Sequence, residues 1–310
     1  MIRAAAAGLL AFAAAGGAAG DIAFVTAQSA NEVAIVELDR GRVRAVVSVP
    51  GAPAPVAYDP ARGRAAIIAA ETGELTLLDT GGAVLGQVGL GEGAFGVAFA
   101  PDGDLLVADW YGARLRRLDP TGKREIWSAS TGKAPAGVAL SDDGRIVAVA
   151  DRDDDRVSAF DAATGQAVWK AGTGSHPYAV AFHDGRFWTT DVQSRSVTVL
   201  DAATGARIGS VATGDHPYGV AFAAGRGFVT DQYAGTVTVF DPASLETLGS
   251  IGIGDYPEGI AALSDGRRLA VASWDSDELS IIDGETLAIE RVIDVPSGPR
   301  SFGLFVGPDR

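Results

Sequence analysis

A short apolar phrase recurs along the chain at a near-constant spacing. GVAF begins at Gly96 and returns as GVAL, AVAF, GVAF and GIAA at residues 137, 179, 219 and 259, with weaker copies at residues 55 and 301. Successive copies therefore start 40 to 42 residues apart. Such a period is typical of chains that repeat one supersecondary unit in a solenoid or a ring. The repeat restricts the chain to these architectures.

Each repeat contains four short runs with the residue preferences of β-strands. In the copy that begins at Gly219, GVAF is followed by GFVTD, TVTVFD and TLGSIGIG, and Gly, Asp or Pro separates the runs. Val237 and Val239 alternate with threonines, which is the period-two pattern of a half-buried strand. No window of the sequence sustains apolar residues at helical spacing. Four strands in about forty residues predict a propeller blade and not a helical repeat.

Counting the repeats gives seven blades. Six full units run from Pro55 to Arg300, and residues 22–50 add only the three strands IAFVTA, EVAIVEL and RVRAVVSV. The missing strand is SFGLFV, residues 301–306, at the other end of the chain. Pairing the two ends completes the seventh blade and leaves no free sheet edge. We therefore predict an all-β fold over residues 21–310: a single seven-bladed β-propeller of four-stranded antiparallel blades, closed by a composite blade from the N- and C-terminal ends.

The first twenty residues differ from the repeats. Arg3 precedes an apolar run over residues 4–15 and small residues up to Gly20, which is the pattern of a secretory signal peptide cleaved before Asp21. The run is too short to favour an uncleaved membrane anchor, and no later run approaches membrane-spanning length. We expect a Sec-type signal peptide at residues 1–20, a periplasmic or secreted protein, and no membrane insertion after cleavage.

The composition narrows the chemistry of the predicted protein. The chain has no cysteine, which excludes disulfides, a lipid-modified cysteine, c-type haem attachment and thiolate metal sites. Its formal net charge of -14 disfavours nucleic acid and anionic lipid as partners, and favours cations or basic partners. We expect a soluble monomer that binds a small ligand, a metal or a periplasmic partner protein.

The repeated phrases resemble those of a known family. P-x-G-V-A-F, L-x-V-A-D and V-x-V-x-D-x-A-T-G, as in HPYGVAF, LLVAD and VTVLDAATG, are similar to the repeats of the bacterial YVTN-repeat β-propellers over residues 21–310. The resemblance implies an exported seven-bladed propeller. Because such propellers have diverse roles, it assigns no function. This chain carries Asp where that family commonly carries Asn after the second strand.

Aligning the repeats separates turn residues from candidate site residues. The Asp that ends each third strand precedes Ala-Thr-Gly or a similar turn, so we expect it to stabilise a tight hairpin. Its copies are Asp79, Asp119, Asp161, Asp201, Asp241 and Asp283. The loop before each first strand and the loop between the second and third strands are expected to open on one face, at the mouth of the central channel.

Two of the three histidines lie in the repeated phrases SHPYAVAF and DHPYGVAF, before a first strand. Four second strands end in Asp at the same predicted mouth. Neutral imidazoles with carboxylates suit Zn²⁺ or Cu²⁺, which makes these residues a candidate metal site. The candidate ligands are His176, His216, Asp109, Asp151, Asp191 and Asp231. A structural interpretation stays open, in which His-Pro packs a turn and each Asp accepts N–H bonds from its own loop.

A second set of residues at the predicted mouth suits an organic ligand. The set combines tyrosines, two tryptophans and an opposite charge pair from the same loops. Its members are Tyr178, Tyr218, Tyr256, Glu258, Arg300, Trp110 and Trp274. Carboxylates and aromatic faces together suit an organic ammonium group or a basic segment of a partner protein, without any metal.

An enzymatic interpretation stays open as the alternative. AFDAATGQAVW at residues 159–169 matches the tryptophan-docking motif A-x-D-x-x-T-G-x-x-x-W of quinoprotein dehydrogenase propellers, and LDPTGKREIW at residues 118–127 is a looser copy. A lactonase-like hydrolase would use the same mouth, but no Ser nucleophile elbow and no Gly-rich phosphate loop supports it. We therefore favour an exported binding or accessory protein, with no catalytic residue assigned, over a propeller enzyme.

Overall fold

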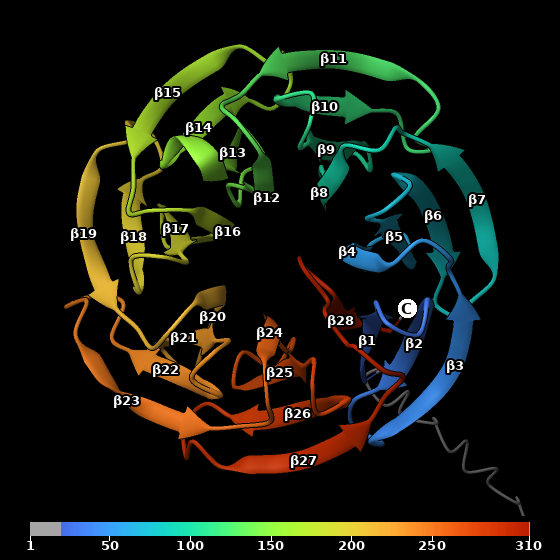
Figure 1. The fold of residues 1–310 in the computed structure, drawn as a ribbon, viewed down its shortest axis with the longest axis vertical. Coiled ribbons are helices and arrows are strands. Elements are labelled where there is room, and N and C mark those ends of the chain that lie inside the picture. Colours follow the sequence, from blue (N-terminus) through green and yellow to red (C-terminus); the bar gives the residue numbers. More distant parts are fainter. Residues whose placement is uncertain (1–19, 310) are drawn as a thin grey trace, which may run out of the picture.

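A computed structural model describes residues 20–309, which form a ring of seven four-stranded β-sheets (Figure 1). Neighbouring strands within each sheet are antiparallel. The predicted seven-bladed all-β propeller is therefore confirmed. The predicted signal peptide, residues 1–20, lies outside the described residues apart from Gly20.

The composite blade contains β28 (Val306–Pro308), β1 (Asp21–Ala27), β2 (Glu32–Glu37) and β3 (Arg42–Ser48). The next three blades contain β4 (Pro53–Asp59), β5 (Arg64–Ala69), β6 (Glu74–Asp79), β7 (Val84–Gly89); β8 (Ala94–Phe99), β9 (Leu105–Asp109), β10 (Arg114–Leu118), β11 (Glu125–Ser130); and β12 (Pro135–Leu140), β13 (Ile146–Asp151), β14 (Arg156–Asp161), β15 (Ala167–Gly172). The last three contain β16 (Pro177–His183), β17 (Arg186–Asp191), β18 (Ser196–Asp201), β19 (Arg207–Ala212); β20 (Pro217–Ala223), β21 (Arg226–Asp231), β22 (Thr236–Phe240), β23 (Thr247–Gly252); and β24 (Pro257–Ala262), β25 (Arg268–Ser273), β26 (Glu278–Asp283), β27 (Ile289–Asp294).

Helical structure within residues 20–309 is limited to the short 3-10 turn η1 (Arg152–Asp154), which follows β13. No helix in this described part of the chain is long and apolar enough to cross a membrane.

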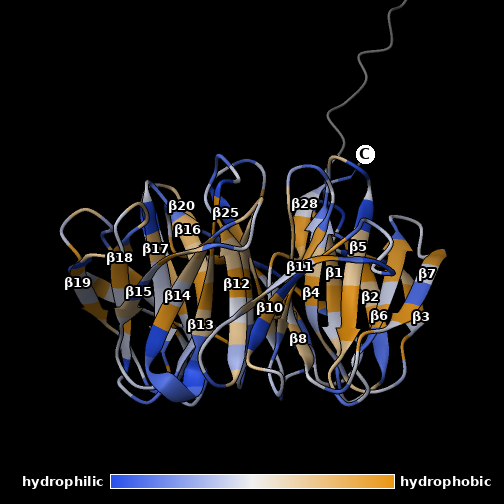
Figure 2. Ribbon diagram, turned by 90° about the horizontal axis from the view of Figure 1, so that it is seen from above, coloured by the Kyte–Doolittle hydropathy of each residue, from blue (hydrophilic) through white to orange (hydrophobic). Residues whose placement is uncertain are grey.

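The burial of each strand follows its position in the blade. The second strands β5, β9, β13 and β25 are buried along nearly their whole length, because each blade packs between two neighbours, and their sequences are rich in Ala, Val, Ile and Leu. The outermost strands β7, β11 and β15 instead alternate between exposed and half-buried residues. Figure 2 shows the hydrophobic residues along the strands and the more hydrophilic residues in the loops at both ends of the ring.

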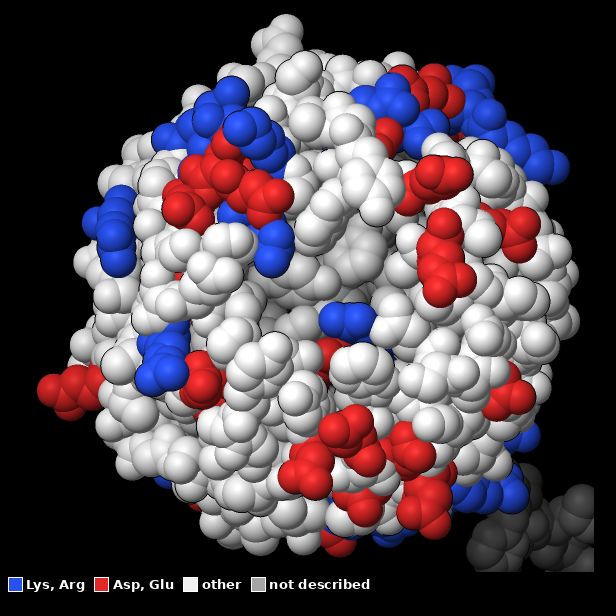
Figure 3. Space-filling model, in the orientation of Figure 1, with Lys and Arg blue, Asp and Glu red and all other residues white. Residues whose placement is uncertain are grey.

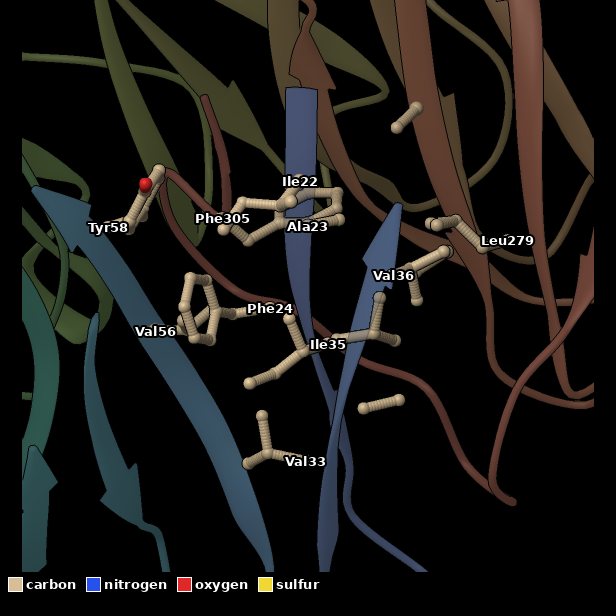
Figure 4. Close-up of a cluster of buried hydrophobic side chains, with 14 of the residues drawn as sticks. Ile22, Ala23, Phe24, Val33, Ile35, Val36, Val56, Tyr58, Leu279 and Phe305 are labelled. Carbon is tan, nitrogen blue, oxygen red and sulfur yellow. The ribbon is translucent and has the colours of Figure 1, made fainter. Parts of the chain in front are cut away.

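The two ends of the chain meet in the composite blade, as the sequence predicts. β28 pairs with β1, with Val306 opposite Ala23. The N–H of Phe24 also donates to the carbonyl of Phe305 at 2.9 Å. The ring of Phe305 is fully buried in the hydrophobic cluster that joins β1, β2 and β4, where Figure 4 places it beside Ile22.

The closing strand is shorter than predicted and starts later. The expected strand covers residues 301–306, whereas β28 begins at Val306. Ser301 (φ 49°) and Gly303 (φ 126°) have left-handed backbone conformations, which interrupt an extended strand. A Cβ at Gly303 would lie 2.2 Å from the carbonyl oxygen of Val56, so the close approach of this segment to β4 requires glycine.

Neighbouring blades are joined by the predicted tryptophan-docking motifs. The indole N–H of Trp169 donates to the carbonyl of Ala202 in the next blade at 2.9 Å, and Trp127 makes the matching bond to Ala162 at 3.2 Å. A Cβ at Gly205 would lie 2.7 Å from the ring of Trp169. The motif in this chain therefore holds one blade against the next, and glycine leaves room for the ring.

The aspartates that end the third strands act as turn residues. Oδ1 of Asp161 accepts hydrogen bonds from both the N–H and the hydroxyl of Thr164 at 2.8 Å, and Asp201 binds Thr204 in the same way. These bonds stabilise the carboxylate, and they lower the pKa of Asp161 and of Asp201 below the usual range of an aspartate. The hairpin role predicted from the sequence is seen at these positions.

Candidate functional site

The two loop types that were predicted to share a face do so. Pro177, which begins β16, lies opposite Asp191, which ends β17, and the same relationship joins Pro217 to Asp231. We call this end of the ring the mouth. The inner strands of the six full blades each contain a β-bulge one residue after they begin at the mouth, for example between Pro177 and Val180. A bulge changes the direction of the side chains that follow it.

The aspartates that end the second strands are buried inside their own blades. Oδ2 of Asp191 accepts hydrogen bonds from Ser196 at 2.9 Å and from Thr198 at 2.7 Å, both on β18. Oδ2 of Asp231 is bound in the same way by Thr236 and Thr238. Burial raises the pKa of Asp191 to about 6, against the opposing effect of these hydrogen bonds.

The other two aspartates of this column also bind within their own blade. Oδ2 of Asp151 lies 2.9 Å from Nε of Arg156 and 2.5 Å from the hydroxyl of Ser158. Asp109 accepts the N–H of Gly112 at 2.7 Å and Nε of Arg114 at 2.8 Å. These contacts correspond to the structural interpretation of the column, in which each carboxylate stabilises its own loop and strands.

The two histidines lie at the mouth and have left-handed backbone conformations. His176 and His216 both have φ of 56°, and Ala52, Ala134 and Tyr256 share the conformation at the same repeat position. Histidine adopts this region several times more often than most non-glycine residues. The recurrence of histidine at this position is therefore consistent with the need for a residue that tolerates a left-handed backbone conformation.

The imidazole rings make local contacts. Nδ1 of His216 lies 2.9 Å from Oδ1 of Asp215, and its ring stacks on Tyr233 with 3.7 Å between centroids. Nδ1 of His176 lies 3.0 Å from the hydroxyl of Ser175. Across residues 20–309, no group of three or more His, Cys, Asp or Glu side chains is arranged to hold a metal ion. The six predicted metal ligands are therefore not assembled into one site.

The third histidine, His183, ends β16 at the opposite end of the ring. The Asp-Gly that follows it is typical of a turn, where a solvated side chain would be expected. The ring instead stacks on Phe222 of the next blade, with 4.1 Å between centroids and 5° between planes. Burial lowers the pKa of His183 below its ordinary value.

Aromatic rings fill the centre of the mouth. Tyr178 and Tyr218 come from adjacent inner strands, and their hydroxyls are 3.3 Å apart. Phe302, from the closing segment, packs on both rings at centroid distances of 4.8 and 5.7 Å. All three side chains are buried, and with Ala136 they form a small apolar cluster. We call the layer formed by Tyr178, Tyr218 and Phe302 the aromatic partition.

A buried ion pair lies beside the aromatic partition. Nε of Arg300 is 2.7 Å from Oε2 of Glu258 and 2.8 Å from the hydroxyl of Tyr218. Nη1 of Arg300 donates to Gln28 at 2.8 Å, and the amide of Gln232 donates to Oε1 of Glu258. Burial raises the pKa of Glu258 to about 7, against the opposing effect of Arg300. Figure 3 shows basic and acidic atoms side by side in the central hollow of the ring.

Further aromatic side chains surround this pair in an arc. The guanidinium of Arg300 lies 5.5 Å from the ring centroids of both Tyr218 and Trp274. Trp274 is followed along the arc by Tyr256 and then Tyr233, at centroid distances of 6.3 and 5.5 Å. On the other side, Trp110 contacts Tyr178 at 6.4 Å. The seven residues predicted for an organic ligand therefore lie in one continuous region of the mouth.

A small pocket opens between these aromatic residues. Its volume is about 180 Å³, and its lining includes Phe95, Trp110, Tyr111, Tyr178 and Arg300. The rings of Phe95 and Trp110 are in edge contact at 5.4 Å. The pocket therefore has four aromatic residues in its lining, together with Arg300 and Glu92.

The sequence prediction omitted several residues of this region. Phe95 occupies the same repeat position as Tyr178, and Phe302 lies two residues after Arg300 in the closing segment. Gln28 and Gln232 lie one residue after the second strand ends, in the same repeat position as Trp110 and Trp274. Reading this position around the whole ring would have found both glutamines.

Comparisons with known proteins agree with the fold. Residues 71–194 match the model of a repeat family described as outer membrane protein assembly factor BamB. No curated protein matches the sequence. The more specific likeness to YVTN-repeat propellers stays a prediction.

Two solved structures show the same architecture. Hydrazine synthase of Kuenenia stuttgartiensis is 19% identical with a TM-score of 0.71, covering 81% of this chain and 89% of its own. A functionally unknown protein from Desulfotomaculum acetoxidans is 14% identical with a TM-score of 0.76, covering 89% of this chain and 97% of its own. At these identities the likeness extends to the fold alone. The chain is a seven-bladed β-propeller whose residues 71–194 are similar to the repeats of that assembly-factor family.

Proposed function

We propose that the protein is an exported binding or accessory propeller whose mouth binds a segment of a partner protein. The observation that carries this proposal is the convergence of exposed and buried aromatic side chains around the Arg300–Glu258 pair. Tyrosine, tryptophan and arginine are the residues that contribute most often to binding energy at protein interfaces. The following contacts favour a protein segment over the other ligands that the sequence suggested.

The aromatic faces that would suit a small cation are already next to the protein's own arginines. Arg300 lies over Tyr218 and Trp274, and the guanidinium of Arg152 lies 5.6 Å from the ring centroid of Trp110. A free ammonium ligand would have to compete with these cation–π contacts. This competition disfavours a small cation at the centre of the mouth.

The volume of the mouth pocket and the exposure of the aromatic residues around it suit the binding of one side chain from a partner protein. A volume of about 180 Å³ suits one large side chain better than a cofactor. Tyr111 beside this pocket is 76% exposed, and Tyr233 on the other side of the mouth is 55% exposed. Large exposed aromatic residues around a pocket are typical of surfaces that exclude water when a partner binds.

The charge of the mouth favours a basic segment. Asp255 and Asp275 are exposed next to Tyr256 and Trp274 in the sequence. Figure 3 shows acidic atoms gathered over the blade of β24 to β27. Complementary charge steers association and selects partners. We therefore propose a segment with an aromatic or large aliphatic side chain flanked by Lys or Arg.

Export and an accessory role are supported by two independent observations. The N-terminal sequence has the pattern of a secretory signal peptide. Residues 71–194 are similar to a family described as an outer membrane protein assembly factor. Expression of the full chain in a Gram-negative host, followed by fractionation and N-terminal sequencing, tests export: a mature protein in the periplasm that begins at Asp21 is expected. A cytoplasmic product that retains Met1 would contradict it.

The enzymatic alternative would rest on Glu258, whose pKa of about 7 suits general acid–base chemistry. However, Oε1 of this carboxylate accepts a hydrogen bond from Gln232, and Oε2 forms an ion pair with Arg300. The carboxylate therefore positions the guanidinium of Arg300, and the contacts favour a binding site.

Selection from a library of random displayed peptides tests the binding proposal. We expect the mature protein to enrich peptides with an aromatic or large aliphatic side chain beside Lys or Arg. Replacing both Tyr111 and Tyr233 by Ala should weaken the selected peptides at least about tenfold in calorimetric titration. Leu248→Ala, at a residue 55% exposed on the outer strand β23, is the matched control and should leave the affinity unchanged. Failure to enrich any peptide, or equal affinity in the double variant, would refute the proposal.

A further inference from the structure

A second cavity occupies the central channel behind the aromatic partition. Its volume is about 400 Å³, within the range of roughly 300–1,000 Å³ that is usual for small-molecule sites. The inner strands β4, β8, β12, β16, β20 and β24 line it, together with the closing segment (Figure 1). Tyr218 and Phe302 of the aromatic partition contribute to its lining on the mouth side. The cavity is thus distinct from the mouth pocket.

The walls of this cavity are apolar because of the repeat itself. Each copy of GVAF places Val, Ala and Phe, or close equivalents, along an inner strand that faces the channel. Val138, Ala139, Val180 and Ala181 are only half-buried, so their apolar surface is available within the channel. Ordered water in a cavity needs several polar partners, and these side chains offer none. Apolar walls of this kind favour an apolar occupant over water.

Leu304 is the clearest sign that the cavity is accessible. Its side chain belongs to the closing segment, lines the cavity and is nevertheless 70% exposed. The neighbouring Phe305 is fully buried, so the exposure of Leu304 does not reflect a loose end of the chain. An exposed leucine inside an apolar cavity loses its contact with water when a ligand enters.

Polar groups line the cavity at its far end as well as at Glu258 and Ser301 on the mouth side. Asp142 and His183 line it at the end of the ring opposite the mouth, where β16 ends. The imidazole of His183 stacks on Phe222, and burial lowers its pKa, which favours the neutral ring. A ligand could keep a polar group at this end, in contact with water, while its apolar part lies between the inner strands.

We propose that the central cavity binds the uncharged apolar part, aromatic or branched aliphatic, of a small organic molecule that enters from the end opposite the mouth. The linings of this cavity and of the mouth pocket share no residue, although Glu258 of the mouth ion pair also lines the cavity. Leu304, Val180 and the phenylalanines of the repeated phrase contribute the contact surface.

The test uses the mature protein and the neutral dye N-phenyl-1-naphthylamine, whose fluorescence rises in apolar surroundings. The unmodified protein should bind the dye saturably. Leu304→Asp places a carboxylate at an exposed position of the wall and should weaken binding at least about tenfold. Val180→Thr keeps a β-branched shape while adding a hydroxyl, and should weaken binding several-fold with the fold retained.

Two control variants separate this site from others. Leu248→Asp introduces the same charge on the outer strand β23, and Tyr111→Ala alters the mouth pocket. Neither should change the dye affinity, and circular dichroism should be the same for all variants. No saturable binding by the unmodified protein, or equal affinity in Leu304→Asp and Val180→Thr, would overturn the proposal. Loss of binding in Tyr111→Ala alone would place the dye at the mouth and would also overturn it.

Discussion

Nε of Arg300 lies 2.7 Å from Oε2 of Glu258 at the centre of the ring, although Arg300 belongs to the closing segment and Glu258 to the inner strand β24. The pair is held by Tyr218, Gln28 and Gln232 and is buried against aromatic rings. Removal of one member of a buried pair leaves the other charge uncompensated. The pair thus links the closing segment to the inner strand β24.

Replacement of Glu258 by Ala should lower the free energy of unfolding by roughly 3–5 kcal/mol, because the guanidinium of Arg300 would remain buried without its partner. The double variant Glu258→Leu with Arg300→Met should be less destabilised than Glu258→Ala, since it removes both charges. Urea denaturation of the three proteins measures both differences. Losses under about 0.5 kcal/mol in the single variant would show that the pair is not structurally coupled.

Closure of the ring should depend on Phe305 and not on its neighbour Leu304. Phe305→Ala removes a fully buried ring from the composite blade and should cost roughly 3–5 kcal/mol in the free energy of unfolding. Leu304→Ala, at an exposed position of the same segment, should change it by less than about 0.5 kcal/mol. Thermal and urea denaturation provide the comparison. Equal stabilities of the two variants would contradict closure through this segment.

Tryptophan docking between blades should make Gly205 more sensitive to substitution than Gly225. Both have positive φ, 72° and 71°, so alanine strains the backbone equally at each. Only at Gly205 would the new Cβ meet the ring of Trp169, at 2.7 Å, whereas Gly225 has nothing within 4 Å. Gly205→Ala should therefore be less stable than Gly225→Ala by about 1 kcal/mol or more, as overpacking predicts. Equal losses would mean that the ring moves aside at no cost.

The histidine position before the first strand should respond to backbone preference. His176 has φ of 56°, so His176→Gly should stay within about 0.5 kcal/mol of the unmodified protein. His176→Val should lose about 1–2 kcal/mol, because a β-branched residue resists this conformation. Chemical denaturation distinguishes the two. A large loss in the glycine variant with a small loss in the valine variant would indicate that the imidazole contacts stabilise the turn instead.

Asp191 should make the protein less stable as pH rises from about 4 to about 6. Its pKa in the folded state is about 6 because of burial, above the ordinary aspartate value of 3.8, so the folded state binds more protons in this interval. Stability then falls with increasing pH, by an amount of the order of 3 kcal/mol at most. Asp191→Asn should reduce this slope. Urea denaturation across this pH interval checks the sign, and a slope that is unchanged in the variant would assign the titration to another group.

The sequence by itself determined the architecture. The spacing of the GVAF phrases, the alternation of Val and Thr, and the Asp and Gly turns are local signals, and each is repeated often enough to define a blade. The count of three strands at one end and a spare strand at the other required closure of the ring. These features depend on residues close together in the sequence, or on copies at a fixed interval, and both can be read without coordinates.

Only the tertiary structure decided which side chains face the mouth. Asp231 and Gln232 are adjacent, yet the carboxylate of Asp231 binds hydroxyls within its own blade while Gln232 reaches Glu258. A shift of one residue along a strand moves a side chain to the opposite face, and the bulges of the inner strands change that direction again. The sequence therefore located the correct loops, whereas the burial of the aspartates and the Arg300–Glu258 pair depend on how the blades close around the axis.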